Sequence, residues 1–529
     1  MPNLPYLRPV LLGLVLLLGL VVRVAQFPGL PPGLNQDEAA SAYEAYSLAE
    51  TGKDKWGNEL PAYFPAWGSG QNVLLAYLTV PVIKVFGLSI ASARGVMLVL
   101  GLLALPLLFY CLRPLGWFAA WLGTLLLAVV PWHFMLTRWG LESNVAPFFM
   151  LLGCTALTRG LSTQRWRWIV PALLPFALSL YAYGTTIVVL PVLLGLVLVL
   201  GWQQLRPRWG SWLLALGLFG VVSAPFGLFF VENYLLGRNL PWTDHLFFAT
   251  PLLPASRLSQ VAGPSWRIMV GDNVRFLLAG FDDGTCYNNL PGFRPLLHFT
   301  LPFVLVALLV GGWQLARQRS QFARSPQAVV LLVFGAWGVG SLGLVCFMQL
   351  NTNRFNHAYL PCLVLAAWAA ARISSGRLRL ALRLGLVLWP LLEGGRAVRA
   401  YFTSYPHGPI QEQFRAGLPA AFAALRELRG VRQVYVTQRI APLNYDMYTL
   451  FYLRYPPARF QRERRVELRD GVYQIRSFGR YVFAAADVVP GQPYGYLAGH
   501  DELPDTAACP RQVVFRNERW EVGVITPGR

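Results

Sequence analysis

Long apolar runs recur along the first three quarters of the chain, separated by short turns rich in arginine. Many of these runs approach or exceed the ~18 residues that mark a membrane-crossing helix. The pattern therefore predicts a polytopic helical bundle of about eleven spans. They are expected near residues 9–27, 92–112, 117–132, 144–160, 168–183, 186–202, 211–231, 296–315, 327–349, 356–372 and 378–394.

A further apolar run, at residues 73–86, differs from the predicted spans. It is short, it contains Lys84, and Pro81 lies in its middle. We expect this segment to form an amphipathic helix at the outer membrane interface, without crossing.

The arginines set the predicted orientation, because turns rich in Arg and Lys face the cytoplasm. If the N-terminus is inside and 73–86 does not cross, the basic clusters all fall on the cytoplasmic side. They contain Arg113, Arg159, Arg165, Arg167, Arg206, Arg208, Arg317, Arg319, Arg324, Arg372, Arg377, Arg379 and Arg383. A crossing at 73–86 would move every one of them outside. We therefore expect a multi-pass plasma-membrane protein with a cytoplasmic N-terminus.

This topology leaves two long outer loops, at 28–91 and 232–295, and an extracytoplasmic tail. The tail is far less hydrophobic than the rest and contains strand-like runs such as residues 434–436. The expected fold is mainly α: a transmembrane domain over 1–395, followed by a soluble α/β domain over 396–529.

Composition agrees with this class, since 55% of the residues are hydrophobic and only 13% are charged. The net charge of +20 is nearly all arginine. In a membrane protein such a balance is explained by cytoplasmic loops and anionic lipid, so we expect no nucleic-acid partner. The six cysteines have no CxxC and no metal-like spacing. Cys286 and Cys509 could meet in an extracytoplasmic disulfide.

Two adjacent acids, Asp37 and Glu38, follow the first span and begin a helix-like run. One interpretation is structural: Asn35 and Glu38 have capping-box spacing, and Asp37 would be favoured by the helix dipole. The other is chemical, because a carboxylate beside the membrane can act as general base toward an acceptor hydroxyl.

A second charged point, Arg138 with Glu142, follows the third span. On a helix these side chains would share a face and could simply pair. Alternatively, an arginine kept on the outer side could bind a phosphate, whose oxygens match the guanidinium group bidentately.

Other candidates lie at the outer ends of later spans. Tyr183 is one, although tyrosine is common at membrane interfaces. Asn353 and Arg354 place amide and cation together at a helix end, where Arg354 could contact a phosphate or merely extend to the interface.

Two polar loop segments complete the candidate set. Asp282 and Asp283 begin an amide-rich loop that could be a turn with Asx caps or part of a sugar or metal site. Gln71 and Asn72 follow the flexible turn Trp67-Gly68-Ser69-Gly70 and could face a substrate.

These motifs resemble those of a known family. Asp37-Glu38 in the first outer loop is similar to the acidic pair of the protein O-mannosyltransferases. More closely, the chain resembles bacterial family-39-like glycosyltransferases, including the aminoarabinose-transferase type, over residues 1 to 395. The motifs are LNQDE at 34–38, WGSG at 67–70, RWGLESN at 138–144, YAYG at 181–184 and NR at 353–354.

The resemblance implies a GT-C glycosyltransferase, which moves a sugar from a polyprenyl phosphate to an acceptor on the outer face. By this resemblance Asp37 would be the general base or a metal-organising acid, and Glu38 would place the acceptor or buttress the loop. Arg138 would bind the donor phosphate and Glu142 would complete the site. The family's second acid is usually aspartate, and here it is Glu142. The accessory domain of the eukaryotic mannosyltransferases has no clear copy, which weakens the expectation of a protein acceptor.

The chemistry expected from this resemblance is an inverting single displacement. Asp37 and Glu142 could hold a divalent metal ion, and no other cofactor is expected. The acceptor could be a cell-envelope glycan, a lipid or a protein. A pre-made lipid donor would also explain why the chain has no Gly-rich nucleotide loop.

Two other functions compete with this one. A lipid or glycan flippase without covalent chemistry would be expected to have acids within its spans and internal repeats. The prominent acids here lie in outer loops instead. The third hypothesis is a non-catalytic anchor that presents the tail to a partner.

Overall fold

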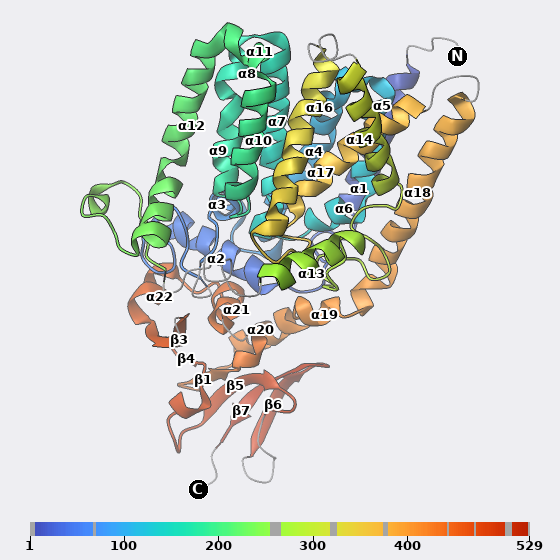
Figure 1. The fold of residues 1–529 in the computed structure, drawn as a ribbon. Coiled ribbons are helices and arrows are strands. Elements are labelled where there is room, and N and C mark those ends of the chain that lie inside the picture. The colour runs from blue at the N-terminus through green and yellow to red at the C-terminus, as the bar shows by residue number, and fades with distance from the viewer. Residues whose placement is uncertain are drawn as a thin grey trace. The chain divides into compact units, whose positions relative to one another are not determined.

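The structure is a computed structural model, and it describes residues 6–66, 70–253, 266–317, 325–373, 379–441, 444–469, 472–502 and 510–526. It is mainly helical, with one β-sheet close to the C-terminus (Figure 1). Contacts divide the chain into two compact units. The first comprises Met1–Phe27, Met97–Ala224 and Leu258–His407, and the second comprises Pro28–Val96, Pro225–Arg257 and Gly408–Arg529.

The first unit is a bundle of apolar helices. Its longer helices are α1 (Leu7–Val24), α5 (Trp117–Val129), α7 (Ala146–Thr163), α9 (Leu174–Leu180), α10 (Thr186–Leu200), α13 (Trp266–Leu278), α14 (Thr300–Arg317), α16 (Pro326–Gly343), α17 (Asn356–Ile373) and α18 (Arg379–Thr403). Shorter turns are α6 (Pro131–Leu136), α8 (Trp166–Ile169) and α11 (Trp202–Leu205). Two helices, α4 (Ile90–Leu112) and α12 (Trp209–Phe230), begin in one unit and end in the other.

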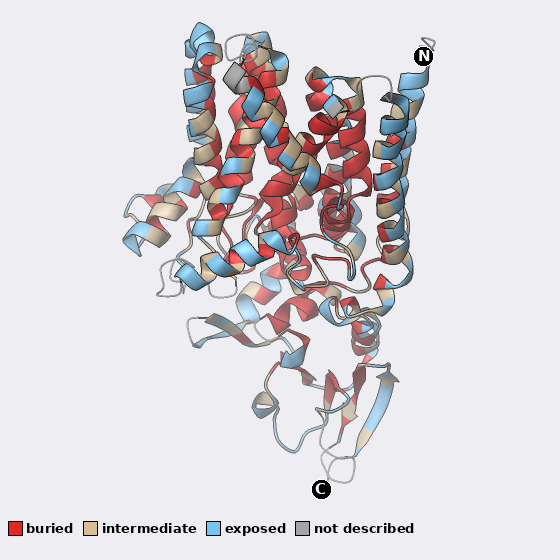
Figure 2. Cartoon of the chain, turned by 45° about the vertical axis from the view of Figure 1, so that its right-hand side comes forward, coloured by how far each residue is buried: buried red, intermediate tan, exposed pale blue. Residues whose placement is uncertain are grey.

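Small residues let the central helices of this unit approach closely. Helix α17 packs against α5, α7, α14 and α16, and α10 packs against α16. Ala366, Ala367, Ala369 and Ala370 of α17 are completely buried. A Cβ added at Gly123 of α5 would lie only 3.4 Å from the Ala367 methyl group. Helices α5 and α17 are largely buried, whereas α18 carries many exposed residues; Figure 2 shows how buried and exposed residues are distributed over the chain. Close packing through small residues is typical of helices that associate in lipid.

Helices occupy all of the predicted spans within the described residues. Five are long and apolar enough to cross a membrane: Leu7–Val24, Ile90–Leu115, Glu142–Thr163, Trp202–Leu236 and Pro326–Cys346. Shorter apolar helices cover Trp117–Val129, Trp166–Leu180, Thr186–Leu200 and Thr300–Gln314. The spans expected at 356–372 and 378–394 are helical too, as α17 and α18, but these two helices are not among the five. The predicted mainly α, multi-pass fold is confirmed, and the number of crossings stays a prediction.

The second unit combines the first outer loop with the tail. Its helices are α2 (Gln36–Thr51), α3 (Leu74–Phe86), α19 (Ile410–Gln413), α20 (Leu418–Glu427), α21 (Tyr445–Tyr452) and α22 (Pro457–Glu463). Helix α3 is the segment predicted at 73–86, and its place at the membrane interface stays a prediction.

A seven-stranded sheet forms the core of the tail. Its strands are β1 (Val434–Val436), β2 (Arg465–Arg469), β3 (Val472–Phe478), β4 (Tyr481–Val482), β5 (Tyr494–Gly499), β6 (Arg511–Arg516) and β7 (Trp520–Ile525). Their order is β2-β3-β4-β1-β5-β7-β6. β1 is parallel to β4 and β5, and the other pairs are antiparallel. With α20 packed against β5, β6 and β7, the tail is the expected α/β domain.

The first outer loop and the tail are joined by hydrogen bonds. The Tyr43 hydroxyl donates to the Tyr455 carbonyl at 2.9 Å, and the Tyr448 hydroxyl donates to the Leu34 carbonyl at 3.0 Å. The Leu34 N–H in turn donates to the Phe414 carbonyl at 2.7 Å. The predicted boundary at 395 between membrane and soluble domains falls within α18 and stays a prediction.

Candidate active site

Helix α2 begins with the capping box that its sequence predicts. The Asn35 side chain accepts a hydrogen bond from the Asp37 N–H at 2.9 Å, and the Glu38 carboxylate accepts one from the Asn35 N–H at 3.2 Å. Backbone donors that a helix start leaves unpaired are thereby satisfied. The capping interpretation of Asn35 and Glu38 is confirmed.

Glu38 also forms a completely buried ion pair with Arg94 of α4. The Arg94 Nε and Nη2 atoms lie 3.0 and 2.9 Å from the two carboxylate oxygens of Glu38, and neither side chain is exposed. Arg94 donates further to the carbonyls of Pro28, Pro31 and Gly33 at 2.7, 2.8 and 2.9 Å. This one guanidinium group therefore fixes both Glu38 and the segment that leads into α2.

Asp37 differs from its neighbour in its surroundings. It lies in the first turn of α2 and is partly exposed. The positive end of the helix dipole favours its ionised form. Its backbone carbonyl accepts a hydrogen bond from the buried Gln71 side chain at 3.5 Å. The fold thus brings Gln71, and the equally buried Asn72 next to it, to the start of α2. Residues 67–69 of the WGSG motif lie outside the described residues.

The buried residue Lys55 contacts two carboxylates. Its ammonium group lies 3.4 Å from Asp446 of α21, and its backbone N–H donates to Glu44 of α2 at 2.8 Å. Burial, together with the charge of Asp54, raises the pKa of Glu44 to about 8. Burial raises the pKa of Asp54 to about 6, and hydrogen bonds from Asn58 oppose this rise.

In the first unit, Arg138 is completely buried and donates to the carbonyls at the end of α1. The distances are 3.0 Å to Val22, 2.8 Å to Arg23 and 2.6 Å to Ala25. These carbonyls have no partner within α1 itself, so the cation stabilises the end of that helix. The Nε atom of Arg138 has no hydrogen-bond partner among the described residues.

The alternative in which Arg138 and Glu142 pair along one helix face is wrong. Helix α6 ends at Leu136, and Arg138 lies in the turn before the 3₁₀ helix η2 (Glu142–Asn144). The two positions are therefore not four apart on a helix, which is what that pairing requires. Glu142 is nearly buried, at 8% exposure.

A second buried arginine, Arg23, complements Arg138 and was not singled out from the sequence. It donates to the carbonyls of Leu127 and Ala128 at the end of α5, at 2.9 and 3.1 Å. Its Nη2 atom lies 2.6 Å from Nδ1 of His133. The signal that could have pointed to Arg23 and Arg94 is the same for both: an arginine within an apolar run needs buried acceptors.

Arg354, Asn353 and Tyr183 are partly exposed. Arg354 precedes α17, and its side chain donates to the Gln349 carbonyl at 2.7 Å. Tyr183 lies between α9 and α10, where its carbonyl accepts a hydrogen bond from the Thr186 N–H. Arg354 is thus less constrained by the protein than Arg138.

The loop at Asp283 is a turn held by its Asx side chain. This was one of the two interpretations of the loop, the other being part of a sugar or metal site. One carboxylate oxygen accepts hydrogen bonds from the N–H and hydroxyl of Thr285 and from Asn289. The other accepts from Asn288 at 3.3 Å and from the Thr352 N–H at 2.8 Å. A carboxylate with this many donors serves to hold the loop.

The predicted site residues divide between the units. Asp37, Glu38, Gln71 and Asn72 lie in the second unit, and Arg138, Glu142, Tyr183, Asn353 and Arg354 lie in the first. In the part of the chain that the structure describes, no group of three or more His, Cys, Asp or Glu side chains could hold a metal ion. A metal bound by the two carboxylates of Asp37 and Glu142 stays a prediction. The predicted disulfide involves Cys509, which lies outside the described residues.

The structure is similar to solved structures along nearly its whole length. ArnT from Cupriavidus metallidurans in the apo state matches with a TM-score of 0.57 and 15% identity, covering 98% of this chain and 97% of that one. ArnT from the same organism bound to undecaprenyl phosphate matches with a TM-score of 0.56, 15% identity and the same coverage. No protein-family model matches the sequence, and no curated protein matches it. The chain therefore shares the fold of these ArnT structures over nearly its whole length.

Proposed function

We propose that this protein is a membrane glycosyltransferase that moves a sugar from a polyprenyl-phosphate donor to an acceptor on the extracytoplasmic face. The observation that carries the proposal is the fold, which is shared over 98% of the chain with ArnT, a protein solved with undecaprenyl phosphate bound. The ordered motifs at residues 34–38, 138–144 and 353–354 support it independently.

In the proposed reaction the acceptor hydroxyl attacks C1 of the sugar while the bond from C1 to the phosphate oxygen breaks. The hydroxyl proton passes to a carboxylate, and the polyprenyl phosphate leaves with the bonding electron pair. Attack opposite to the leaving group inverts the configuration at C1. This chemistry needs one base and one group that stabilises the growing charge on the phosphate.

Asp37 is our candidate for the base. Of the two adjacent acids, Glu38 is completely buried and bound by Arg94, so its carboxylate buttresses the loop. Asp37 is partly exposed, in a helix start fixed by the capping box. A base whose neighbours are rigid loses little conformational entropy when it takes up its reactive position.

For the leaving phosphate we propose Arg354 as the principal contact, since it is partly exposed and makes one side-chain hydrogen bond. The unpartnered Nε of Arg138 is a second donor. Glu142 would complete the site, with Tyr183, Asn353, Gln71 and Asn72 as polar contacts to the sugars. A divalent ion held by Asp37 and Glu142 would supply further charge stabilisation.

The proposed location is the plasma membrane, with the N-terminus in the cytoplasm and the tail outside. The distribution of arginine among the turns supports this orientation. It places the start of α2 on the side where an acceptor of the cell envelope would be met.

The test uses the purified chain in lipid with a panel of labelled polyprenyl-phosphate sugars and cell-envelope extracts as acceptors. We expect one donor to be consumed, with inversion at C1 of the product. Glu50→Gln is the matched control for Asp37→Asn, because Glu50 is an exposed acid on the same helix. Retention of configuration would contradict the single displacement, and equal loss in both variants would contradict the role of Asp37.

A further inference from the structure

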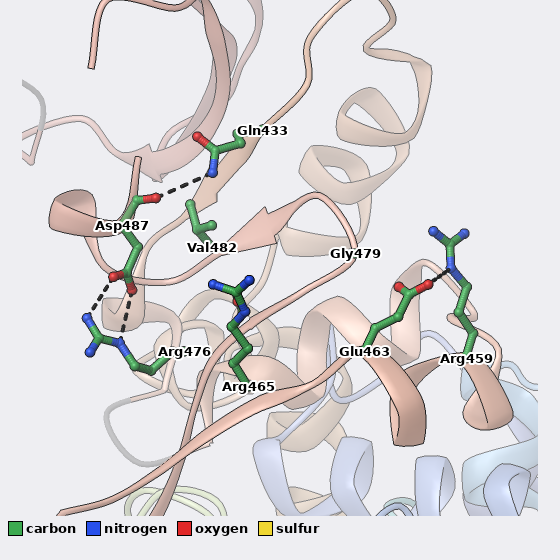
Figure 3. A pocket seen from close by; sticks show the side chains of 9 residues that line it. Gln433, Arg459, Glu463, Arg465, Arg476, Gly479, Val482 and Asp487 are labelled. Carbon is green, nitrogen blue, oxygen red and sulfur yellow. Dashed lines mark hydrogen bonds and ion pairs between the residues drawn. The ribbon is translucent and has the colours of Figure 1, made fainter. Parts of the chain in front are cut away.

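A polar pocket lies in the tail, between helix α22, strands β2 to β4 and the 3₁₀ helix η11 (Ala485–Asp487) (Figure 3). Its volume of 720 Å³ falls within the range of pockets that hold small molecules. It is lined by Gln433, Arg459, Glu463, Arg465, Arg476, Ser477, Gly479, Val482 and Asp487. None of these residues belongs to the proposed transfer site.

Two of the three arginines in this pocket are paired with acids. Arg459 lies 2.7 Å from Glu463, and Arg476 lies 2.6 Å from Asp487. In Figure 3 these two pairs stand on opposite sides of the pocket. Their side chains are thus held by each other, and their charges largely cancel.

Arg465 is the third arginine, and it differs from the other two. It is exposed at the start of the edge strand β2, and its side chain lies between the two ion pairs (Figure 3). Its backbone pairs with strand β3, but its side chain has no hydrogen-bond or ion-pair partner among the described residues. All of its planar N–H donors are therefore available to an anion, and a carboxylate or phosphate matches their geometry.

The other lining residues can form hydrogen bonds with hydroxyl groups, and neighbouring residues hold their side chains in place. The Gln433 amide is oriented by the Val489 N–H at 2.7 Å and the Asp487 carbonyl at 3.4 Å. The Glu463 carboxylate is further held by the Tyr455 hydroxyl at 2.6 Å. Gly479 has a φ of +53°, and a Cβ there would lie 2.5 Å from the Tyr455 hydroxyl oxygen, so this turn requires glycine.

We propose that this pocket binds a saccharide that carries a carboxylate or phosphate group. The anionic group is bound by Arg465, and sugar hydroxyls are bound by the acids of the two pairs, by Ser477 and by Gln433. A neutral sugar would leave the N–H donors of Arg465 without an acceptor. An anion without a sugar would leave the residues that bind hydroxyl groups without a ligand. The site stands on these tail residues alone and does not depend on the proposed transferase activity.

The experiment measures binding to the full chain in lipid nanodiscs by calorimetry. The probes are glucuronate, glucose 6-phosphate, glucose and inorganic phosphate. We expect both anionic sugars to bind, and glucose and inorganic phosphate to bind at least about tenfold more weakly, the factor typical of one lost charge-assisted hydrogen bond. Inorganic phosphate binding as tightly as glucose 6-phosphate would mean an adventitious ion only and would overturn the proposal.

Arg465→Gln tests the role of the unpaired cation. It should raise the Kd of both anionic sugars about tenfold. Arg462→Gln is the matched control, since it removes one charge three residues earlier, outside the pocket lining. Equal weakening in both variants, or no heat from either anionic sugar with the wild type, would overturn the proposal. Sugar release from a lipid donor is measured on the same variants and is expected to persist. A failure of the saccharide-binding proposal can therefore be distinguished from a failure of the proposed transferase function.

Discussion

Arg94 holds Glu38 through two hydrogen bonds, of 3.0 and 2.9 Å, in a completely buried ion pair. This relationship gives the two adjacent acids at the start of α2 different roles. Glu38 is committed to the fold, and Asp37 is left partly exposed beside it. We regard this separation as the structural basis for assigning the base to Asp37 alone.

The first prediction concerns the stability of this pair. Breaking a buried ion pair by removing one partner leaves the other charge uncompensated and costs about 3–5 kcal/mol. We expect Glu38→Gln to lower the melting temperature of the purified protein, and Arg94→Gln to lower it further, because Arg94 also binds three carbonyls. Differential scanning fluorimetry in detergent measures both. An unchanged melting temperature for Arg94→Gln would contradict the buttressing role.

The second prediction concerns pH. Burial raises the pKa of Glu44 in the folded protein to about 8, above its usual value of 4.5. A raised carboxyl pKa means that the folded state binds the proton more tightly, so this contribution to stability is fully present below about pH 4.5 and is lost as pH rises from there to about 8. The melting temperature should therefore fall between about pH 5 and pH 8, and fall less in Glu44→Gln. Parallel pH profiles for the two proteins would be inconsistent with this.

The third prediction concerns the link between the first outer loop and the tail. Tyr448→Phe removes the hydroxyl that donates to the Leu34 carbonyl and should cost about 1–2 kcal/mol, because that carbonyl loses a buried partner. We also expect slower sugar transfer, since Leu34 immediately precedes the cap of α2. Tyr473→Phe is the control, because Tyr473 is 39% exposed and its hydroxyl makes no hydrogen bond among the described residues. Equal effects of the two changes on turnover would argue against the link.

The fourth prediction separates the two candidate phosphate ligands. Arg354→Gln should raise the Kd for a polyprenyl-phosphate donor about tenfold or more, with little change in melting temperature, because its side chain is partly exposed. Arg138→Gln should lower the melting temperature as well, because three carbonyls lose their donor. Donor binding and melting temperature are measured on both variants. A stable Arg138→Gln protein would show that those hydrogen bonds contribute little.

Much of this fold could be predicted from the sequence, because it depends on local and periodic signals. The apolar runs predicted the helices, and the spacing of Asn35 and Glu38 predicted the capping box. The strand-like composition of residues 434–436 predicted a strand, and it became β1.

The parts of the fold and of the site that could not be predicted from the sequence depend on contacts between residues distant in the chain. Nothing near Glu38 in the sequence indicates that Arg94, 56 positions later, binds it. The arginines Arg23 and Arg94 lie inside apolar runs, and only the folded structure supplies the carbonyls that accept their hydrogen bonds. The attachment of α2 to α21 and α22 is equally non-local, so the joining of the first outer loop to the tail could not be predicted.

The most direct test of the account is the release of sugar from labelled polyprenyl-phosphate donors by the purified chain in lipid. Wild type and Asp37→Asn are compared at equal donor occupancy, with melting temperature as the check on folding. We predict that wild type consumes one donor of the panel, and that Asp37→Asn binds the same donor, stays folded and releases no sugar. Undiminished release by Asp37→Asn, or no release by wild type from any donor while a polyprenyl phosphate still binds, would contradict it.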